Sequence, residues 1–260
     1  MIVFNLSQEA LQSFADNGFV IIRSFFNPEK LSETKTAMDR YITEVVPSLP
    51  DSDAFYIDKS DASTLKQLQR IAENDPYFER YANDSDALSV CNQLLGEDVQ
   101  TRGVEWFCKP SGSTHPTPPH QDNFYFCLSP PSVVTVWIAL DVVDTTNGCL
   151  HYVPGSHKHG IRDHGATSIV GFSQGIVDFG DKEMAIETPV HLEPGDCVIH
   201  HGNTIHRADP NPSDRTRRGF ALVIEGASAQ RDDDAFSRYV DSVQAQHESL
   251  GLDVDQSIYK

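Results

Sequence analysis

The chain has 260 residues, of which 39% are hydrophobic and 22% are charged, and this composition excludes a disordered or fibrous protein. An excess of 38 acidic over 20 basic residues gives a formal net charge of -18. Such a surface repels phosphate backbones and anionic lipid headgroups. We therefore expect neither nucleic acid nor a membrane surface as the main partner, and a small molecule in their place.

The sequence also carries signals about compartment. No run approaches the roughly 18–20 apolar residues of a membrane span, and the first residues lack the pattern of a signal peptide. The five cysteines are scattered without a CxxC motif, which disfavours a disulfide framework or a thiolate zinc site. These features predict a cytoplasmic protein, and they do not define an oligomeric state.

The first third of the chain has mainly helical patterns. A short amphipathic stretch is broken at Asn17-Gly18, and the apolar run 18–26 predicts a buried strand. Asn27-Pro28 predicts the start of a helix, with Asn as N-cap and Pro at the first helical position. Two further helices are predicted at 65–72 and 86–95.

From about residue 100 the pattern changes to short strands separated by turn signals such as Asn147-Gly148. Strands are predicted at 101–109, 133–143, 149–153, 188–192, 196–201 and 219–225. Many short strands at this spacing favour an all-β sandwich or barrel. A final helix is predicted at 233–247. The prediction is one domain over 1–260, with a helical N-terminal part to about 98, a β core over about 99–228 and a C-terminal helix over about 230–248.

Two histidines have an acidic residue two positions later. His191 and Glu193 lie just before a turn, and we interpret them as an exposed strand end. His120 and Asp122 follow a proline-rich turn and precede an apolar run. If both lie on one strand end, they point to the same face and could bind one metal ion side by side.

A third ligand could come from the segment 196–225, which offers His200, His201 and His206. Two histidines and one carboxylate with open coordination positions are typical of non-haem Fe(II) oxygenases, although zinc could bind the same three residues.

Arginines precede the last predicted strand, at Arg215, Arg217 and Arg218. A buried arginine holds a carboxylate through two parallel hydrogen bonds, whereas an exposed one would only be solvated. Alternation places Arg217 and Gly219 on one face of that strand.

Four phrases, in this order and spacing, resemble the phytanoyl-CoA dioxygenase family of Fe(II)- and 2-oxoglutarate-dependent oxygenases. They are GFVIIRSFF, PPHQDNFYF, VTVWIALDVVDTTNGCLHYVPGSHKHG and EPGDCVIHHGNTIHRADPNPSDRTRRGFAL. The resemblance covers most of the chain. It implies a mainly β fold with flanking helices, whose core is a double-stranded β-helix of the jelly-roll, cupin-like type.

The resemblance also implies roles for individual residues. His120, Asp122 and His206 match the iron ligands of the family, and Arg217 matches the arginine that grips the distal carboxylate of 2-oxoglutarate. Trp137 falls where the family places an aromatic residue against the cosubstrate.

Two further cosubstrate contacts are implied less directly. Lys66 matches a lysine that some members use on the cosubstrate, although the local match is short and a solvated helix lysine is the alternative. Ala208 stands where members often carry a serine, and Ser213 could replace that serine or only cap its turn.

The implied reaction uses Fe(II), 2-oxoglutarate and O2 to hydroxylate an aliphatic carbon, with succinate and CO2 as coproducts. Residues beside the metal phrases are candidates for the substrate pocket: Glu105, Phe107, His115, Asn123, Tyr125 and His151. Alternation places Glu105, Phe107 and Lys109 on one face, which fits a small polar substrate if that face is not solvent-exposed. A hydroxylase of acyl-CoA or natural products is an alternative within the family. A zinc-dependent hydrolase and a non-catalytic jelly-roll binding protein are alternatives from other classes.

Overall fold

The computed structural model describes residues 4–167 and 174–250. Its strands are β1 (Phe19–Ile22), β2 (Ala54–Tyr56), β3 (Leu65–Leu68), β4 (Val99–Lys109), β5 (Thr117–His120), β6 (Leu128–Ser129), β7 (Val133–Ala139), β8 (Leu150–Tyr152), β9 (His164–Ala166), β10 (Gln174–Ile176), β11 (Thr188–Val190), β12 (Cys197–His201), β13 (His206–Ala208), β14 (Arg217–Gly226) and β15 (Gln230–Arg231). The α-helices are α1 (Gln8–Asn17), α2 (Pro28–Glu44), α3 (Ile71–Asn74), α4 (Pro76–Glu79), α5 (Ser85–Leu95), α6 (Asp122–Phe126), α7 (Asp181–Met184) and α8 (Asp233–Leu250). Short 3-10 helices span Val46–Ser48, Ala62–Thr64, Arg80–Asn83 and Ser156–His159.

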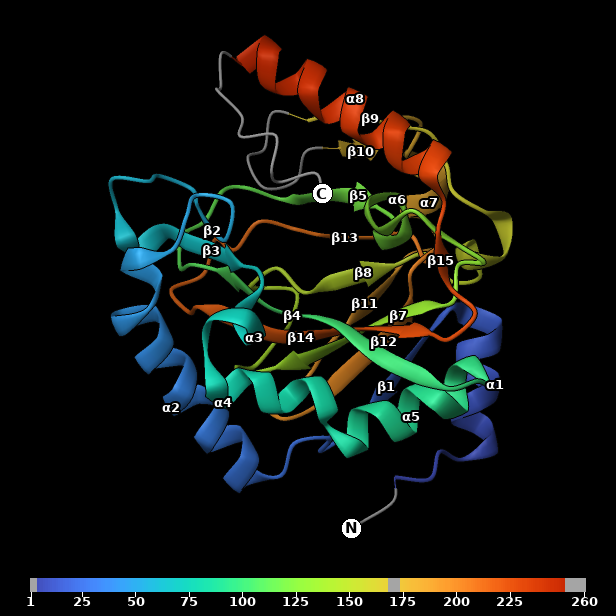
Figure 1. Ribbon diagram of the computed structural model, residues 1–260, viewed down its shortest axis with the longest axis horizontal. Helices are drawn as coiled ribbons and strands as arrows, with labels where there is room; N and C mark the ends of the chain where they lie inside the picture. Colours follow the sequence, from blue (N-terminus) through green and yellow to red (C-terminus); the bar gives the residue numbers. More distant parts are fainter. Residues whose placement is uncertain (1–3, 168–173, 251–260) are drawn as a thin grey trace.

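Two antiparallel sheets form the centre of the molecule (Figure 1). The larger has seven strands in the order β1-β12-β7-β14-β4-β3-β2, and the smaller has four in the order β11-β8-β13-β5. The non-sequential strand order, with helices outside the sheets, is the jelly-roll arrangement that the sequence predicted.

The alternation of side chains along β7 shows how the larger sheet is used on both faces. Trp137 and Ala139 belong to an apolar cluster shared with Leu150 and Tyr152 of the smaller sheet. Val136 and Ile138 point the other way, into the cluster that the helices cover. Because both faces are covered, all seven residues of β7 are buried, and six of them are apolar, the exception being Thr135.

The helices of the first hundred residues pack on the outer face of the larger sheet, seen below the sheet in Figure 1. Met38 and Tyr41 of α2, Phe78 of α4 and Val90 of α5 are buried there beside Phe220 of β14. On the opposite side of the molecule, α8 lies near α6 and β9.

Local capping explains where the first helices begin and end. Gly18 closes α1 in the left-handed region, with φ at 82°, as expected from the Asn17-Gly18 break. The Asn27 side chain accepts a hydrogen bond from the Lys30 backbone N–H, and Pro28 occupies the first turn of α2. The predicted helix start at Asn27-Pro28 is therefore confirmed.

The predicted helix at 65–72 is wrong. Residues Leu65–Leu68 form β3, which pairs with β2 on one side and with β4 on the other, and only Ile71–Asn74 are helical. Between them, Arg70 adopts a left-handed conformation with φ at 52°, which separates the strand from the helix. Pairing with two neighbouring strands outweighs the local helix propensity of this polar segment.

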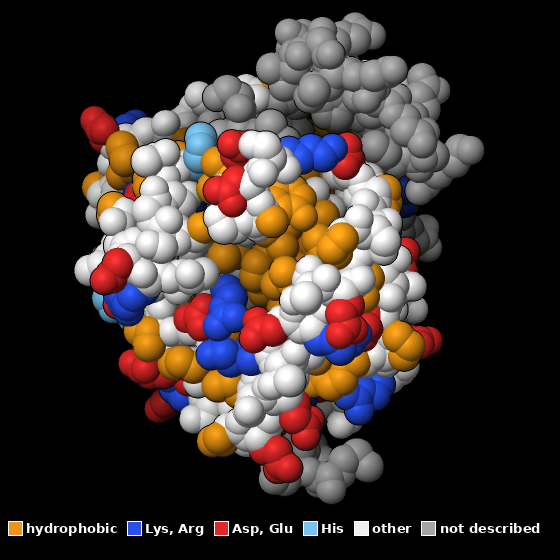
Figure 2. All heavy atoms as spheres, turned by 90° about the vertical axis from the view of Figure 1, so that its left-hand side faces the viewer, with side chains coloured by type: hydrophobic (Ala, Val, Ile, Leu, Met, Phe, Trp, Pro, Cys, Tyr) orange, Lys and Arg blue, Asp and Glu red, His pale blue; other side chains and the backbone are white. Residues whose placement is uncertain are grey.

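The surface carries separate apolar and charged areas. Figure 2 views the face at the left of Figure 1, where apolar side chains gather near the centre and are bordered by acidic and basic ones. Among the described helices, none combines the length and the apolar character needed to cross a membrane. All five cysteines are buried free thiols.

Candidate active site

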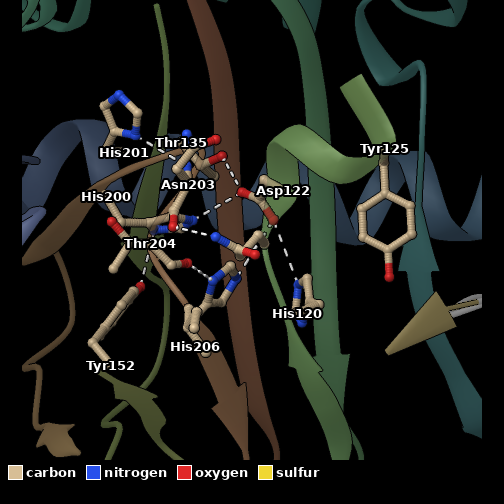
Figure 3. A network of polar contacts seen from close by, with 12 residues as sticks. His120, Asp122, Tyr125, Thr135, Tyr152, His200, His201, Asn203, Thr204 and His206 are labelled. Atoms are coloured by element: carbon tan, nitrogen blue, oxygen red, sulfur yellow. Dashed lines mark hydrogen bonds and ion pairs between the residues drawn. The ribbon is translucent and has the colours of Figure 1, made fainter. Parts of the chain in front are cut away.

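Strand register and one short helix bring three predicted ligands together. His206 at the start of β13 pairs directly with His120 at the end of β5, and their ring centroids lie 4.1 Å apart. Asp122 opens α6, and its Oδ1 lies 3.5 Å from Nε2 of each histidine. The ligand atoms of all three residues lie within 4.8 Å of one another, and Figure 3 shows the side chains converging.

The way in which His120 and Asp122 meet differs from the sequence prediction. We expected both residues on one strand end, with the i and i+2 side chains on one face. The chain instead turns at Gln121, so that His120 ends a strand and Asp122 begins a helix. The turn aims the carboxylate back across the end of β5, which alternation along a strand could not predict.

Backbone contacts orient both histidine rings. His120 Nδ1 lies 2.8 Å from the Pro118 carbonyl, and His206 Nδ1 lies 2.9 Å from the Thr204 carbonyl. An N–H at Nδ1 donates to each carbonyl and leaves the lone pair at Nε2 for a metal ion. Burial and the neighbouring His120 hold the pKa of His206 well below its usual value, which keeps its imidazole neutral.

The second carboxylate oxygen of Asp122 is held by the protein. The Thr135 hydroxyl donates to Oδ2 at 2.6 Å, and His200 Nε2 donates to the same oxygen at 2.9 Å. Tyr152 in turn donates to His200 Nδ1 at 3.0 Å (Figure 3). Burial alone would raise the pKa of Asp122, but the adjacent histidines hold it well below its usual value, so the carboxylate stays ionised.

These supporting residues were missed by the sequence analysis. His200 was considered only as a ligand, whereas it holds the carboxylate of one. Thr135 lies two residues before Trp137 on β7 and directly opposite His200 of β12. Alternation from Trp137 along this strand could have identified Thr135 as facing the same side.

A cavity of about 190 Å³ opens beside the three ligands. Its lining includes Trp137, Arg217, Glu105 and Phe107. Glu105 and Phe107 therefore lie on the inner face of β4, as alternation predicted if that face is not solvent-exposed.

Arg217 contributes a buried positive charge to this cavity. Its side chain is buried, with 4% exposed, and neither its Nε nor its Nη1 has a hydrogen-bond partner. Its guanidinium lies 5.2 Å from the ring centroid of Trp137. Gly219 shares this face of β14, and a Cβ there would overlap the Trp137 ring. Only glycine therefore admits the tryptophan beside the arginine.

A smaller cavity of about 40 Å³ adjoins the first, and Arg217 lines both. Lys66 of β3 and Lys109 of β4 also line the smaller cavity, and Lys109 pairs directly with Arg217 across the strands. Burial lowers the pKa of Lys66 to about 8, and burial together with the Arg217 charge lowers the pKa of Lys109 to about 7. Three basic side chains gathered in buried surroundings form a site suited to an anion, whose charge would favour their protonated forms.

The structure corrects several of the other candidate positions. Asn123 does not line the cavity, because its side-chain amide bonds both the N–H and the carbonyl of Leu128. Ser213 donates to the Asn211 side chain and caps a turn, so it is not a cosubstrate contact in either cavity.

Two histidines considered for the pocket lie outside the main cavity. His115 is exposed and lines the smaller cavity, and its carbonyl accepts a hydrogen bond from Lys109. His151 is buried outside the main cavity, 3.2 Å from both Glu187 and Asp209. Of the candidates for the substrate pocket, Glu105, Phe107 and Tyr125 line the cavity.

A jelly-roll that places two histidines and one carboxylate around an open position belongs structurally with the non-haem iron oxygenases. The family model for phytanoyl-CoA dioxygenase matches residues 14–219. The chain therefore belongs to the phytanoyl-CoA dioxygenase family, which confirms the resemblance and the dioxygenase class expected from the sequence.

Individual relatives agree with this assignment and differ in what their names say they act on. A rice protein named phytanoyl-CoA dioxygenase 1 is 27% identical, covering 85% of this chain and 89% of its own length. A probable alpha-ketoglutarate-dependent hypophosphite dioxygenase of Stutzerimonas stutzeri is 26% identical, covering 83% and 77%.

Among solved structures, the epimerase SnoN in complex with Fe3+, alpha ketoglutarate and nogalamycin RO superposes with a TM-score of 0.70. It is 21% identical, covering 86% of this chain and 85% of its own. The cofactors expected from the sequence, Fe(II), 2-oxoglutarate and O2, agree with these names and with the His-Asp-His cluster.

Proposed function

We propose that this protein is an Fe(II)- and 2-oxoglutarate-dependent hydroxylase of a small polar metabolite, and that it releases succinate and CO2. The observation that carries the proposal is that one cavity contains both a set of metal ligands and a binding position for an anion. A three-residue ligand set open on one side lies beside a buried arginine with unpaired donors.

The donor set fits a ferrous ion. His120, Asp122 and His206 would hold it through two neutral imidazoles and one carboxylate oxygen, which is the facial set typical of non-haem iron. When bound, iron and 2-oxoglutarate together supply the oxidising chemistry with O2. The role of this chain is to place the ligands and to exclude water from the cavity.

Arg217 would bind the distal carboxylate of 2-oxoglutarate. Its guanidinium could donate to one carboxylate from a single edge, which would give either Nε or Nη1 the partner that it lacks. Lys66 and Lys109 line the adjoining cavity and add positive charge near the same group. Trp137 packs against the guanidinium and limits where the cosubstrate can lie.

The size of the cavity supports a small substrate. Its volume of about 190 Å³ is below the roughly 300–1,000 Å³ of sites for drug-sized ligands. It would hold the cosubstrate and a compact molecule more readily than a long acyl-CoA. A hydroxylase of acyl-CoA or natural products is the alternative within the family. The cytoplasmic location expected from the sequence stays a prediction.

An anaerobic titration tests the proposal. We expect Fe(II) followed by 2-oxoglutarate to produce a weak visible charge-transfer band in the wild-type protein. Arg217→Ala should raise the 2-oxoglutarate concentration needed for that band by roughly 100-fold, because a charge-assisted bidentate contact is lost. Arg215→Ala is the matched control, since Arg215 is more exposed and is paired with Asp144.

Two outcomes would contradict the proposal. If no band forms and the protein binds zinc tightly at the same ligands, a hydrolase or a binding protein would replace the hydroxylase. If Arg217→Ala and Arg215→Ala behave alike, Arg217 does not bind the cosubstrate. A several-fold effect of Lys66→Met on the same titration would place Lys66 in the cosubstrate site.

A further inference from the structure

One wall of the main cavity presents oxygen acceptors that the cosubstrate site does not use. It is formed by Gln67 of β3 and Glu105 of β4. Gln67 is buried, with 4% exposed, and its side chain hydrogen-bonds the Glu105 carboxyl. Its Oε1 atom has no hydrogen-bond partner. A buried acceptor without a hydrogen-bond donor lowers the stability of the protein. A ligand that donates a hydrogen bond to Oε1 would remove this cost.

The net charge of the cavity with Fe(II) and 2-oxoglutarate bound indicates which kind of hydrogen-bond donor the ligand carries. A ferrous ion and Arg217 together carry three positive charges, and Asp122 and 2-oxoglutarate together carry three negative ones. Among the groups that line the main cavity these charges cancel, and the Glu105 carboxylate is left without a counter-charge there, because Lys66 and Lys109 line only the adjoining cavity. Arg217 is the sole lysine or arginine among the described residues that line this cavity. A monocation beside Glu105 would restore neutrality.

Aromatic side chains in the cavity also favour a cationic ligand. Phe107, Tyr125 and Tyr239 also line the cavity. The Tyr125 hydroxyl donates to the Gln174 carbonyl, so this phenol is already supplied with a partner. Ring faces attract an organic cation, and they also pack against its carbon skeleton.

We propose that the substrate is a small aliphatic amine that binds as the ammonium ion, with its N–H groups donating to Glu105 and to Oε1 of Gln67. This inference rests on the proposed function and specifies its substrate class. Glu105 and Gln67 are then specificity-determining residues, and they take no part in holding the metal ion.

The test uses whole protein loaded anaerobically with Fe(II) and 2-oxoglutarate at pH 8. The probes are aliphatic and cyclic primary amines of three to six carbons, each with the alcohol and the carboxylic acid of the same skeleton. Binding is followed by the change in the charge-transfer band and by calorimetry. We expect the best amine to bind at least about 10-fold more tightly than its alcohol and its acid, as a charge-assisted hydrogen bond requires.

Variants locate the origin of this preference. Glu105→Gln keeps the shape but removes the charge, and it should reduce the preference for amine over alcohol to less than about twofold. Glu105→Asp keeps the charge and should retain the preference. Glu193→Gln is the matched control because Glu193 is exposed at a turn. The affinity for 2-oxoglutarate and the preference for amine should both be unchanged in Glu193→Gln.

The outcomes separate this inference from the proposed function. If the band forms but amines bind no better than their alcohols and acids, or if none of the panel binds, the amine assignment is overturned and the hydroxylase proposal stands. An amine preference that persists in Glu105→Gln also overturns it. If no band forms in the wild-type protein, both proposals fall together.

Discussion

The two ends of the cavity are built differently. At the metal end, the protein itself bonds the polar atoms that do not face the ion: both Nδ1 atoms contact carbonyls, and Oδ2 of Asp122 accepts from Thr135 and His200. At the other end, Arg217 and Gln67 keep buried polar atoms without partners.

The metal ligands are thus held in place before the ion binds, whereas the polar atoms at the other end gain partners only from a bound organic ligand. A metal ion needs ligand atoms held in one geometry, so the protein fixes them before the ion binds. An organic anion or cation supplies its own donors and acceptors, so the protein leaves complementary groups unpaired at a cost in stability. Substitutions at the two ends should therefore affect stability and binding in different ways.

The largest effect is expected at the metal end. Asp122→Asn removes the ionised ligand and offers an amide in its place, so iron-dependent formation of succinate should fall by roughly 1,000-fold or more. Iron content after dialysis and single-turnover assays would measure this. Retained iron and activity would show that the wrong triad was chosen.

Arg217→Met sharpens the comparison because it should have opposite effects on two measurements. Binding of 2-oxoglutarate should weaken, while the ligand-free protein should become more stable by roughly 1–3 kcal/mol, since an unpaired buried charge is replaced by an apolar chain. Urea unfolding without metal or cosubstrate measures the second effect. A loss of stability would mean that Arg217 is satisfied within the free protein.

A smaller effect is expected behind the metal ligand. Thr135→Val keeps the shape but deletes the hydroxyl that donates to Asp122. Iron affinity should fall by roughly 10–100-fold, as is usual when support for a ligand is removed. Competition with a coloured chelator measures the affinity. Thr146→Val is the control, because Thr146 is exposed and its hydroxyl donates to Asp144 away from the cavity.

The last effect concerns Glu105 and pH. Burial, with a further contribution from the charge of Asp122, raises the pKa of Glu105 to about 7 from its ordinary 4.5. Between these values the folded protein holds a proton that the unfolded chain has released. The contribution of Glu105 to stability is therefore fully present below pH 4.5 and is lost as the pH rises through 7.

The Glu105→Gln protein has no titrating group at this position. The free energy of unfolding of its ligand-free form should therefore rise relative to that of the wild type as the pH rises. The gain from pH 4.5 to pH 8 should be roughly 1–3 kcal/mol, discounted for the partial exposure of the side chain. Urea unfolding of both proteins across this range measures it. A pH-independent difference would contradict the raised pKa.

The sequence by itself determined much of the fold and the chemical character of the site. Helix caps such as Asn27-Pro28 and the alternation along 101–109 depend on neighbouring residues, and the structure follows them. The resemblance assigned His120, Asp122, His206 and Arg217 because the phrases that contain them are long. Alternation placed Glu105 and Phe107 on one face, and both line the cavity.

Only the tertiary structure decided which distant groups meet. It made 65–68 a strand that brings Lys66 and Gln67 to the cavities, turned Asn123 and Ser213 away from them, and set His200 behind Asp122. These outcomes depend on strand register and on pairing between segments far apart in the chain. A shift of one residue in register reverses the face of every side chain, and local sequence does not contain that information.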